Sequence, residues 1–232
     1  MQYDLVLVMP IYNEEECIEG VLNSWKDVLG QLGINYLILA INDGSTDGTK
    51  TILQNFEQDP NCEVINKTNS GHGPTILMGY RKAVQLAPWV FQCDSDDEIR
   101  AEHFSLLWQQ REDYDALFGI RSGRVQSWSR LFITKISRMT VKALFGSRVT
   151  DVNAPFRLMR TEYLSPIVRQ VPDDTFAPNL IISGSLSKSD LRIQNLPVPF
   201  EQRRTGTISI VKWKLWKSAA RAFWQTIRFK PS

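Results

Sequence analysis

Apolar runs alternate with helical segments along residues 1–98, and this alternation limits the fold of the chain more than any other feature. Each run is short enough for a strand and ends in polar or turn-forming residues. Strands separated by helices at this spacing form βαβ units, so they are parallel and carry helices on both faces. We therefore expect an α/β fold with a mostly parallel central sheet flanked by helices. The predicted strands are Leu5–Met9, Tyr36–Ile41, Glu63–Asn66 and Trp89–Cys93.

The helices between these strands have recognisable starts. Asn13 is expected to cap the first helix, ahead of an acidic first turn at Glu14–Glu16 and an apolar series from Ile18 to Trp25. A later helix is expected from about Pro74 to Leu86, after a glycine-containing loop.

The size and composition indicate one folded domain, with 232 residues, 43% hydrophobic and 22% charged. The three cysteines, Cys17, Cys62 and Cys93, have no CxxC spacing, which argues against a disulfide framework or a zinc site and favours a reducing compartment. The first residues lack the basic and apolar regions of a signal peptide. No apolar run reaches the roughly 18 residues of a transmembrane helix. We therefore expect a cytoplasmic protein.

Charge is unevenly distributed, although the net charge is only +2. Residues 203–232 contain eight Lys or Arg and no acidic residue, and residues 121–160 contain nine basic residues and one acid. The rest of the chain is strongly acidic. This division predicts a cationic side that meets phosphates, anionic lipids or both.

Polar clusters follow three of the predicted strands, at Tyr12–Glu14, Asn42–Asp47 and Asp94–Glu98. Ligands of open parallel sheets bind outside the carboxyl ends of the strands. These clusters are therefore the candidate functional site.

Asp94 and Asp96 lie directly after a strand, at positions i and i+2. Two carboxylates in that arrangement can converge on one hard cation, Mg²⁺ or Mn²⁺, whose coordination a nucleotide diphosphate would complete. A solvated acidic turn is the alternative interpretation, and the position at the mouth of a parallel sheet favours the metal.

The other two clusters suit a nucleoside. Tyr12 is an aromatic residue on which a planar base can stack, and Asp43 can accept a hydrogen bond from a base N–H. None of the loops has the GxGxxG or P-loop spacing, which disfavours dinucleotide binding and NTPase activity.

Taken together, the motifs resemble glycosyltransferase family 2, whose members are inverting enzymes with a GT-A fold. The last of the matching segments looks like the closing motif of the polyprenyl-phosphate sugar transferase branch, typified by dolichyl-phosphate mannose synthase. The matching segments are P-I-Y-N-E at 10–14, N-D-G-S-T-D-G-T at 42–49, N-S-G-H-G-P at 69–74, D-S-D at 94–96, G-I-R at 119–121, P-F-R-L-M-R at 155–160 after Asp151, and L-P-V-P-F at 196–200 with Arg203 and Gly206.

The resemblance implies a role for each matched position. It implies that Asp94 and Asp96 hold the metal and the diphosphate, with Asp96 and Arg121 in the catalytic centre. Arg203 would also belong to the catalytic centre, and both Arg130 and Arg203 would face the acceptor phosphate. Surface salt bridges are the alternative for all three arginines. The implied donor is a UDP- or GDP-sugar, and its nucleoside would be bound by Pro10, Tyr12, Glu14 and Asp43.

The catalytic base that such enzymes use on a hydroxyl acceptor has no clear counterpart. The corresponding stretch, residues 173–179, ends in Asn179, which cannot act as a base, while Asp173 or Asp174 could. A hydroxyl must lose a proton as it attacks, whereas a phosphate monoester is already anionic and needs only cations and alignment. Arginine-rich acceptor machinery without a clear base favours a phosphate acceptor.

The C-terminal residues 207–232 predict a basic amphipathic helix, with tryptophan and phenylalanine on one face and lysine and arginine on the other. Residues 128–145 resemble this arrangement. An ordinary helix packed on the core is the alternative. We expect peripheral association with the cytoplasmic face of a membrane. Nucleic acid is not an expected partner, since no binding motif is present and the acids at the sheet would repel it.

These observations predict one GT-A-like domain over residues 1–206, followed by the tail. Within it, 1–120 would bind the nucleotide-sugar and 121–206 the acceptor. The expected enzyme transfers a sugar, with inversion, to a polyprenyl-phosphate or another lipid-linked acceptor. The alternatives are transfer to a sugar hydroxyl in polysaccharide or cell-envelope glycan synthesis, and a catalytically silent, membrane-docked nucleotide-sugar-binding protein. A nucleotidyltransferase is disfavoured, because a Gly- and Lys/Arg-rich loop after the first strand is missing.

Overall fold

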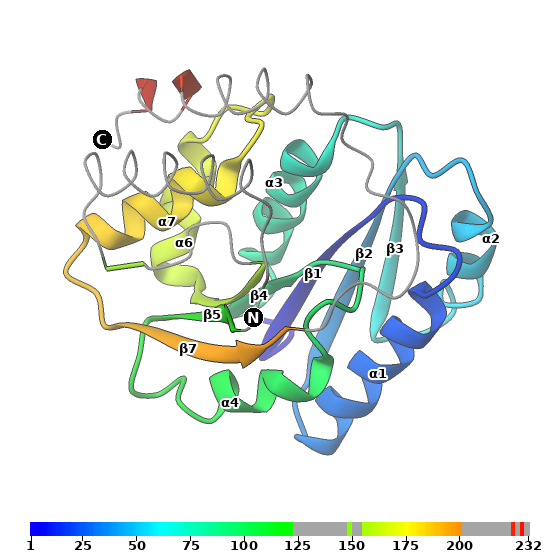
Figure 1. The fold of residues 1–232 in the computed structure, drawn as a ribbon, viewed down its shortest axis with the longest axis horizontal. Coiled ribbons are helices and arrows are strands. Elements are labelled where there is room, and N and C mark those ends of the chain that lie inside the picture. Colours follow the sequence, from blue (N-terminus) through cyan, green and yellow to red (C-terminus); the bar gives the residue numbers. More distant parts are fainter. Residues whose placement is uncertain (123–147, 150–154, 201–223, 226–227, 230–232) are drawn as a thin grey trace.

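The computed structural model describes residues 1–122, 148–149, 155–200, 224–225 and 228–229. In this part of the chain seven strands form one sheet in the order β3-β2-β1-β4-β6-β5-β7 (Figure 1). Six of them run in one direction, and β6 is antiparallel to both of its neighbours. The expected α/β fold with a mostly parallel sheet is confirmed. The strands are β1 Leu5–Ile11, β2 Tyr36–Asp43, β3 Cys62–Lys67, β4 Trp89–Cys93, β5 Ala116–Ser122, β6 Phe156–Arg160 and β7 Ile193–Pro199.

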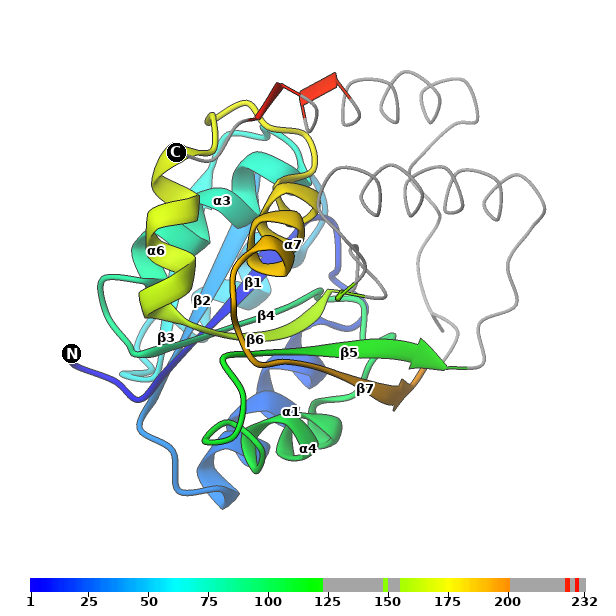
Figure 2. The same cartoon turned by 90° about the vertical axis from the view of Figure 1, so that its left-hand side faces the viewer.

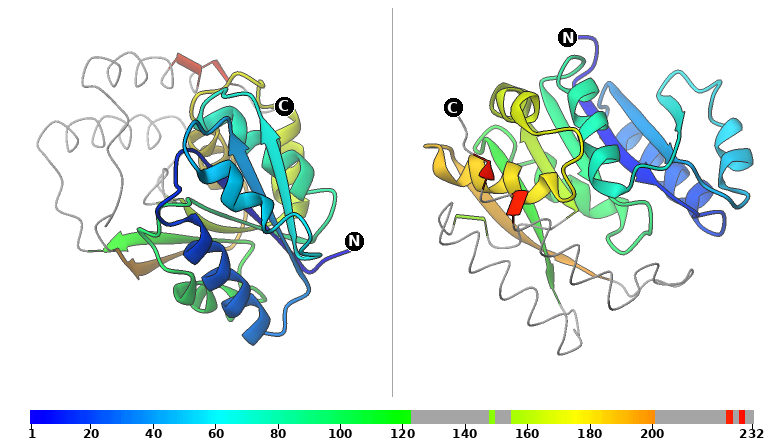
Figure 3. Two further views of the ribbon diagram at one scale, coloured as in Figure 1. Left: turned by 90° about the vertical axis from the view of Figure 1, so that its right-hand side faces the viewer. Right: turned by 90° about the horizontal axis from the view of Figure 1, so that it is seen from above.

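Helices cover both faces of this sheet (Figure 2). Helices α1, α2 and α4 lie on one face, and α3, α6 and α7 lie on the other, a layering that is also visible from two further sides (Figure 3). The helices are α1 Ile18–Gln31, α2 Thr49–Gln54, α3 His72–Ala83, α4 Phe104–Trp108, α6 Thr161–Gln170 and α7 Pro178–Lys188, with a 3₁₀ turn at Ala101–His103.

Because helices cover both faces of the sheet, its central strands are apolar along their whole length. In β1, Leu5, Leu7 and Met9 pack toward α1, while Val6 and Val8 pack toward α3. A strand covered on both sides has no solvent face, and the simple alternation of an exposed sheet is absent.

Side chains and one glycine set the spacing of the layers. Trp25 of α1 packs against Phe91 of β4 at 5.2 Å between ring centroids, and Phe91 meets Phe156 of β6 at 4.8 Å. On the other face, a Cβ at Gly79 would overlap Val8 and Ile41, so the absence of a side chain lets α3 approach β1 and β2.

One predicted helix cap is wrong, and one predicted helix starts slightly earlier than expected. Asn13 does not cap the first helix: its φ is 53°, and α1 begins at Ile18 after Cys17. The side-chain oxygen of Asn13 accepts a hydrogen bond from Thr46 N instead, at 2.8 Å, and an Asn that bonds another loop cannot cap its own helix. Helix α3 begins at His72, two residues before the predicted Pro74.

The acceptor side and the tail are described only in part. Arg130, Asp151 and Arg203, the segment 128–145 and most of the predicted amphipathic helix fall outside the described residues. Strand β5 crosses the boundary between residues 120 and 121, so the division of the domain by role stays a prediction. Among the described residues, no helix is long and apolar enough to cross a membrane.

Candidate functional site

The three polar clusters lie at one edge of the sheet, as predicted. Strands β2, β1 and β4 are adjacent and parallel, so the residues that follow Ile11, Asp43 and Cys93 emerge on the same side. Strand β5 is parallel to β4, so Arg121, near its carboxyl end, lies at this edge too.

The loop after β1 is joined to the loop after β2 by hydrogen bonds. Asn13 N donates to Ser45 Oγ at 3.0 Å, and Glu14 N donates to Thr49 Oγ1 at 2.8 Å. Burial alone would raise the pKa of Asp47, but hydrogen bonds from Thr49 and from backbone amides outweigh it and hold that pKa below its usual value. Two polar loops are thus held as one surface around the end of β1.

Asp43 is buried, at 3% exposure, under the loop that follows β3. One carboxylate oxygen accepts Ser70 N at 2.8 Å, and the other accepts Gly71 N at 2.9 Å. The ammonium group of Lys67 forms an ion pair with the same carboxylate. Asp43 therefore fixes the 68–71 loop, and its predicted contact with a nucleoside stays a prediction.

Gly44 allows the loops after β2 and β3 to meet. Its φ is +69°, and a Cβ at this position would lie 2.7 Å from Asn69 N. A residue with a side chain would have to adopt a disfavoured backbone conformation and push the neighbouring backbone away.

The first loop also presents the other predicted nucleoside contacts. Tyr12 is 40% exposed, so its ring is accessible to a planar ligand, whereas Pro10 and Glu14 are buried. Cys17 Sγ lies 3.4 Å from Glu14 Oε2 and 3.6 Å from Ser95 O, which connects this loop to the aspartate loop.

Asp94 and Asp96 are both partly exposed on either side of the buried Ser95. Asp94 Oδ1 accepts a hydrogen bond from Gln92 Nε2 at 3.2 Å and lies 3.6 Å from His72 Nε2. Asp96 Oδ1 accepts Glu98 N at 3.2 Å. The described residues contain no group of three or more His, Cys, Asp and Glu side chains that could hold a metal ion alone. Two hard oxygen donors fit a divalent cation that takes its remaining ligands from a bound molecule.

The loop between α6 and α7 lies over the start of α3. A Cβ at Gly73 would overlap the carbonyl oxygens of Thr175 and Phe176, so this loop is seated next to His72. Asp174, the predicted candidate base, is exposed in that loop. Asp173 forms an ion pair with Arg81.

Sequence reasoning missed His72 and Gln92, which both contact Asp94. His72 is part of the glycine-containing loop motif, but only the fold brings it to the aspartate loop. Gln92 did leave a signal, since a glutamine in the middle of the apolar run Trp89–Cys93 is a buried polar group that requires partners.

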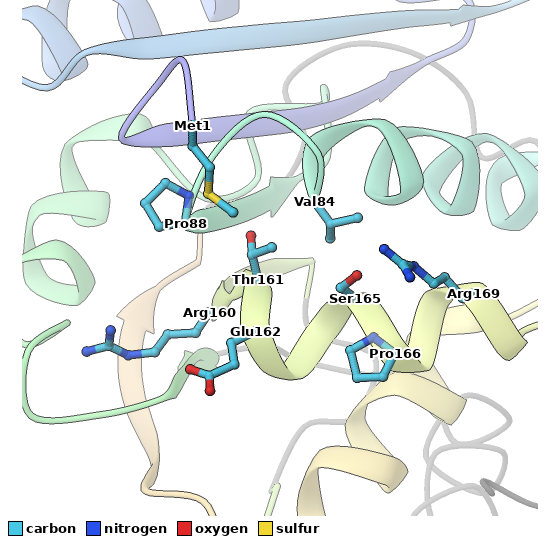
Figure 4. A pocket seen from close by; sticks show the side chains of 9 residues that line it. All are labelled: Met1, Val84, Pro88, Arg160, Thr161, Glu162, Ser165, Pro166 and Arg169. Atoms are coloured by element: carbon cyan, nitrogen blue, oxygen red, sulfur yellow. The ribbon is translucent and has the colours of Figure 1, made fainter.

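A pocket of about 490 Å³ lies at the opposite edge of the sheet (Figure 4). Met1 precedes β1, Pro88 precedes β4, and Thr161 follows the antiparallel β6, so the pocket shares no residue with the predicted site. Side chains of both charges line it, among them Arg169 and Glu162.

The mostly parallel sheet, the helices on both of its faces and the polar loops at its carboxyl edge place the chain in the class of GT-A-like α/β folds. The sequence profile of glycosyl transferase family 2 matches residues 6–167. The chain belongs to this family, which confirms the resemblance.

Relatives identified by sequence are named as glycosyltransferases or sugar transferases. The chain is 27% identical to an uncharacterized glycosyltransferase of Synechocystis sp. over 222 residues, which cover 94% of this chain and 68% of the relative. It is 25% identical to undecaprenyl-phosphate 4-deoxy-4-formamido-L-arabinose transferase of Pectobacterium carotovorum over 205 residues, which cover 87% of this chain and 61% of the relative. The chain thus spans about two thirds of the length of these relatives.

Solved structures share the fold. Glucosyl-3-phosphoglycerate synthase of Mycobacterium tuberculosis, crystallised with Mn²⁺, UDP and glucosyl-3-phosphoglycerate, matches with a TM-score of 0.67 and 16% identity over 97% of this chain and 79% of its own. TarS of S. aureus, crystallised with UDP-GlcNAc, matches with a TM-score of 0.60 and 18% identity over 93% of this chain and 64% of its own.

Proposed function

We propose that the chain is a metal-dependent inverting glycosyltransferase that moves a sugar from a nucleotide-sugar to a polyprenyl-phosphate or another lipid-linked acceptor. The observation that carries this proposal is the position of Asp94 and Asp96, which share one sheet edge with the loops of Tyr12 and Asp43. Family membership and the undecaprenyl-phosphate transferases among the relatives support it.

The donor would lie across the ends of β2, β1 and β4. Its base would stack on the exposed ring of Tyr12, with Pro10 and Glu14 forming the buried floor. Asp43 would order the 68–71 loop and offer its remaining acceptor position to a base N–H. UDP in the neighbouring structures favours a UDP-sugar over a GDP-sugar.

Asp94 and Asp96 would hold a divalent cation, Mg²⁺ or Mn²⁺, together with the diphosphate. When bound, the cation supplies positive charge to the departing diphosphate. His72, 3.6 Å from Asp94, would face the same phosphates from the start of α3.

Transfer would be a single displacement. An acceptor oxygen forms a bond to the anomeric carbon while the bond from that carbon to the diphosphate oxygen breaks, and the electron pair leaves with the nucleoside diphosphate. Arg121, Arg130 and Arg203 would neutralise and align the phosphates of donor and acceptor, which is the main requirement of an already anionic nucleophile.

The tail would hold the enzyme at the cytoplasmic face of a membrane, close to a lipid-linked acceptor. Trp224 is 58% exposed, and the guanidinium of Arg228 lies 5.6 Å from the centre of its ring. Gln225 receives a hydrogen bond at Oε1 from Phe176 N at 2.8 Å, and Phe176 is itself 40% exposed. Exposed aromatic rings beside a basic side chain fit the interface of an anionic bilayer.

A sugar hydroxyl is the second candidate acceptor. The observation in its favour is the exposed Asp174, in a loop that touches the first turn of α3, where a base for a hydroxyl would be needed.

Asp96→Asn tests the proposal. The variant should keep the melting temperature of the parent and lose Mn²⁺-dependent release of UDP from UDP-sugars, since one cation ligand loses its charge. Asp97→Asn is the matched control: Asp97 is the exposed neighbour with a φ of 54°, a conformation that Asn tolerates, and activity should persist. Full activity of the parent in EDTA would refute metal dependence, and a parent that binds UDP-sugar without turnover would indicate a silent binding protein.

A further inference from the structure

A chain of buried polar side chains leads from the helical layer to Asp94. Tyr80 of α3 and Gln92 of β4 are fully buried, and Asn179, in the first turn of α7, is 8% exposed. All three lie on the face of the sheet that α3 and α7 cover, beside the apolar residues of that layer. Polar groups in such a place cost free energy unless they are hydrogen-bonded, so their partners are informative.

The hydrogen bonds run in one direction. Tyr80 Oη donates to Asn179 Oδ1 at 3.0 Å and also lies 3.4 Å from Gln92 Oε1, while Asn179 Nδ2 donates to Gln92 Oε1 at 3.2 Å. Gln92 Nε2 then donates to Asp94 Oδ1 at 3.2 Å. An ionised carboxylate can only accept, so it determines the orientation of each amide behind it. Burial raises the pKa of Tyr80 well above its usual value, which keeps its hydroxyl protonated as the first donor.

Arg157 anchors the helix that carries Asn179. It is paired in register with Gln92 across β6 and β4 and is fully buried. Its Nη1 donates to Ser183 Oγ at 3.1 Å and to Asn179 O at 3.4 Å. Its guanidinium also lies 5.5 Å from the ring centre of Phe118. The first turns of α7 are therefore held against the same pair of strands.

We propose that Gln92 and Asn179 are positioning residues for the Asp94 carboxylate, holding it in the orientation in which it binds the cation and diphosphate. The proposal rests on the function given above and adds two residues that act through Asp94 without touching substrate. Successive hydrogen bonds in such a chain polarise one another and strengthen each other. A carboxylate that is already held in place also loses less conformational freedom when it binds the cation. Asparagine is required at position 179, because an aspartate there has no N–H for Gln92.

Mn²⁺ affinity in the presence of saturating UDP tests the proposal, measured by electron paramagnetic resonance of the free ion. Gln92→Met keeps the approximate volume and removes all three hydrogen bonds of the Gln92 side chain. It should weaken Mn²⁺ binding by about 10- to 100-fold, the usual effect of removing a group that orients a metal ligand. Asn179→Asp and Tyr80→Phe should each weaken binding less, since both residues act on Asp94 only through Gln92, and Tyr80→Phe should have the smaller effect because its contact with Gln92 is the longer one, at 3.4 Å against 3.2 Å.

Thr161→Val is the matched control. Thr161 is buried and donates to Ala87 O, but it lies at the opposite edge of the sheet. This variant should lose stability and leave Mn²⁺ affinity unchanged, which separates positioning from a general loss of buried hydrogen bonds. Melting followed by circular dichroism establishes that each variant is folded.

Two outcomes overturn different statements. If folded Gln92→Met binds Mn²⁺ as tightly as the parent, the positioning role is wrong while the proposed function stands. If the parent with UDP binds no Mn²⁺, the proposed function itself fails. Should Gln92→Met not fold, Asn179→Asp decides by the same measurement, and parental affinity in that variant overturns the proposal.

Discussion

Asp43 and Lys67 are the last residues of neighbouring strands β2 and β3, are paired in register, and form an ion pair that is almost closed off from solvent. The ammonium group of Lys67 also donates to Thr68 O at 2.8 Å and to Ser70 Oγ at 2.7 Å. One cation thus joins the end of the sheet to the loop over the predicted nucleoside site.

Lys67→Met should therefore destabilise the protein by about 2–4 kcal/mol, since it leaves a buried carboxylate with only its backbone partners. Urea denaturation measures the change. Lys82→Met is the matched control, because the Lys82–Glu63 pair has side chains that are each 40% exposed, and its loss should cost less than about 1 kcal/mol. Equal effects of the two substitutions would show that the buried Asp43–Lys67 pair stabilises the fold no more than the exposed Lys82–Glu63 pair does.

Gly73→Ala should displace the loop between α6 and α7. A Cβ at this position would overlap two backbone carbonyl oxygens, and backbone cannot move aside as a flexible side chain can. We expect a loss of about 1–3 kcal/mol together with weaker UDP binding. Gly20→Ala in α1 is the control: no atom lies near a Cβ there, and the substitution should raise stability by up to about 1 kcal/mol. Thermal melting and UDP titration report the two effects, and an unchanged Gly73→Ala variant would contradict the close contact.

The acceptor can be identified from Asp173, Asp174 and Arg203. If the acceptor is a phosphate, neutralising both aspartates should leave most activity, while Arg203→Ala should lose it. A hydroxyl acceptor predicts a loss of roughly a hundredfold or more in the double variant, because the attacking group then needs a base. Steady-state rates with a polyprenyl-phosphate and with a glycan acceptor measure this. A folded but inactive double variant would favour the hydroxyl acceptor.

Trp224→Ala should weaken binding to liposomes that contain anionic lipid. Burial of one large aromatic side chain contributes at most about 1.5–3 kcal/mol, so partitioning should fall by up to roughly 10- to 100-fold at an unchanged melting temperature. Leu106→Ala is the control, since Leu106 is 43% exposed on α4, across the sheet from the layer against which Phe229 packs.

Deletion of residues 208–232 extends this test. The truncated protein should leave the liposomes and still bind UDP at the carboxyl edge of β1 and β2. Loss of its cooperative melting transition would show instead that the tail aromatics are part of the core.

Much of the site could be predicted because it depends on strand direction. The apolar runs identified β1, β2 and β4, and parallel strands bring their carboxyl ends together whatever the loops contain. Asp94, Asp96 and Tyr12 were located in this way. The start of α1 could not be predicted in this way. The side chain of Asn13 accepts a hydrogen bond from Thr46, 33 residues away, and this bond competes with helix capping.

Over residues 1–98, the sequence alone determined the order of strands and helices, the edge at which the polar loops meet and the residue types available there. These follow from the short apolar runs of buried strands, from the 3.6-residue periodicity of helices and from the shared direction of βαβ strands, which are local properties. Only the tertiary structure decided which polar groups meet. Lys67 reaches Asp43 across 24 residues, and Asn179 reaches Gln92 across 87. The first pair depends on the register of β2 and β3, and the second on how closely α7 approaches the sheet. That distance is determined by side-chain packing throughout the core.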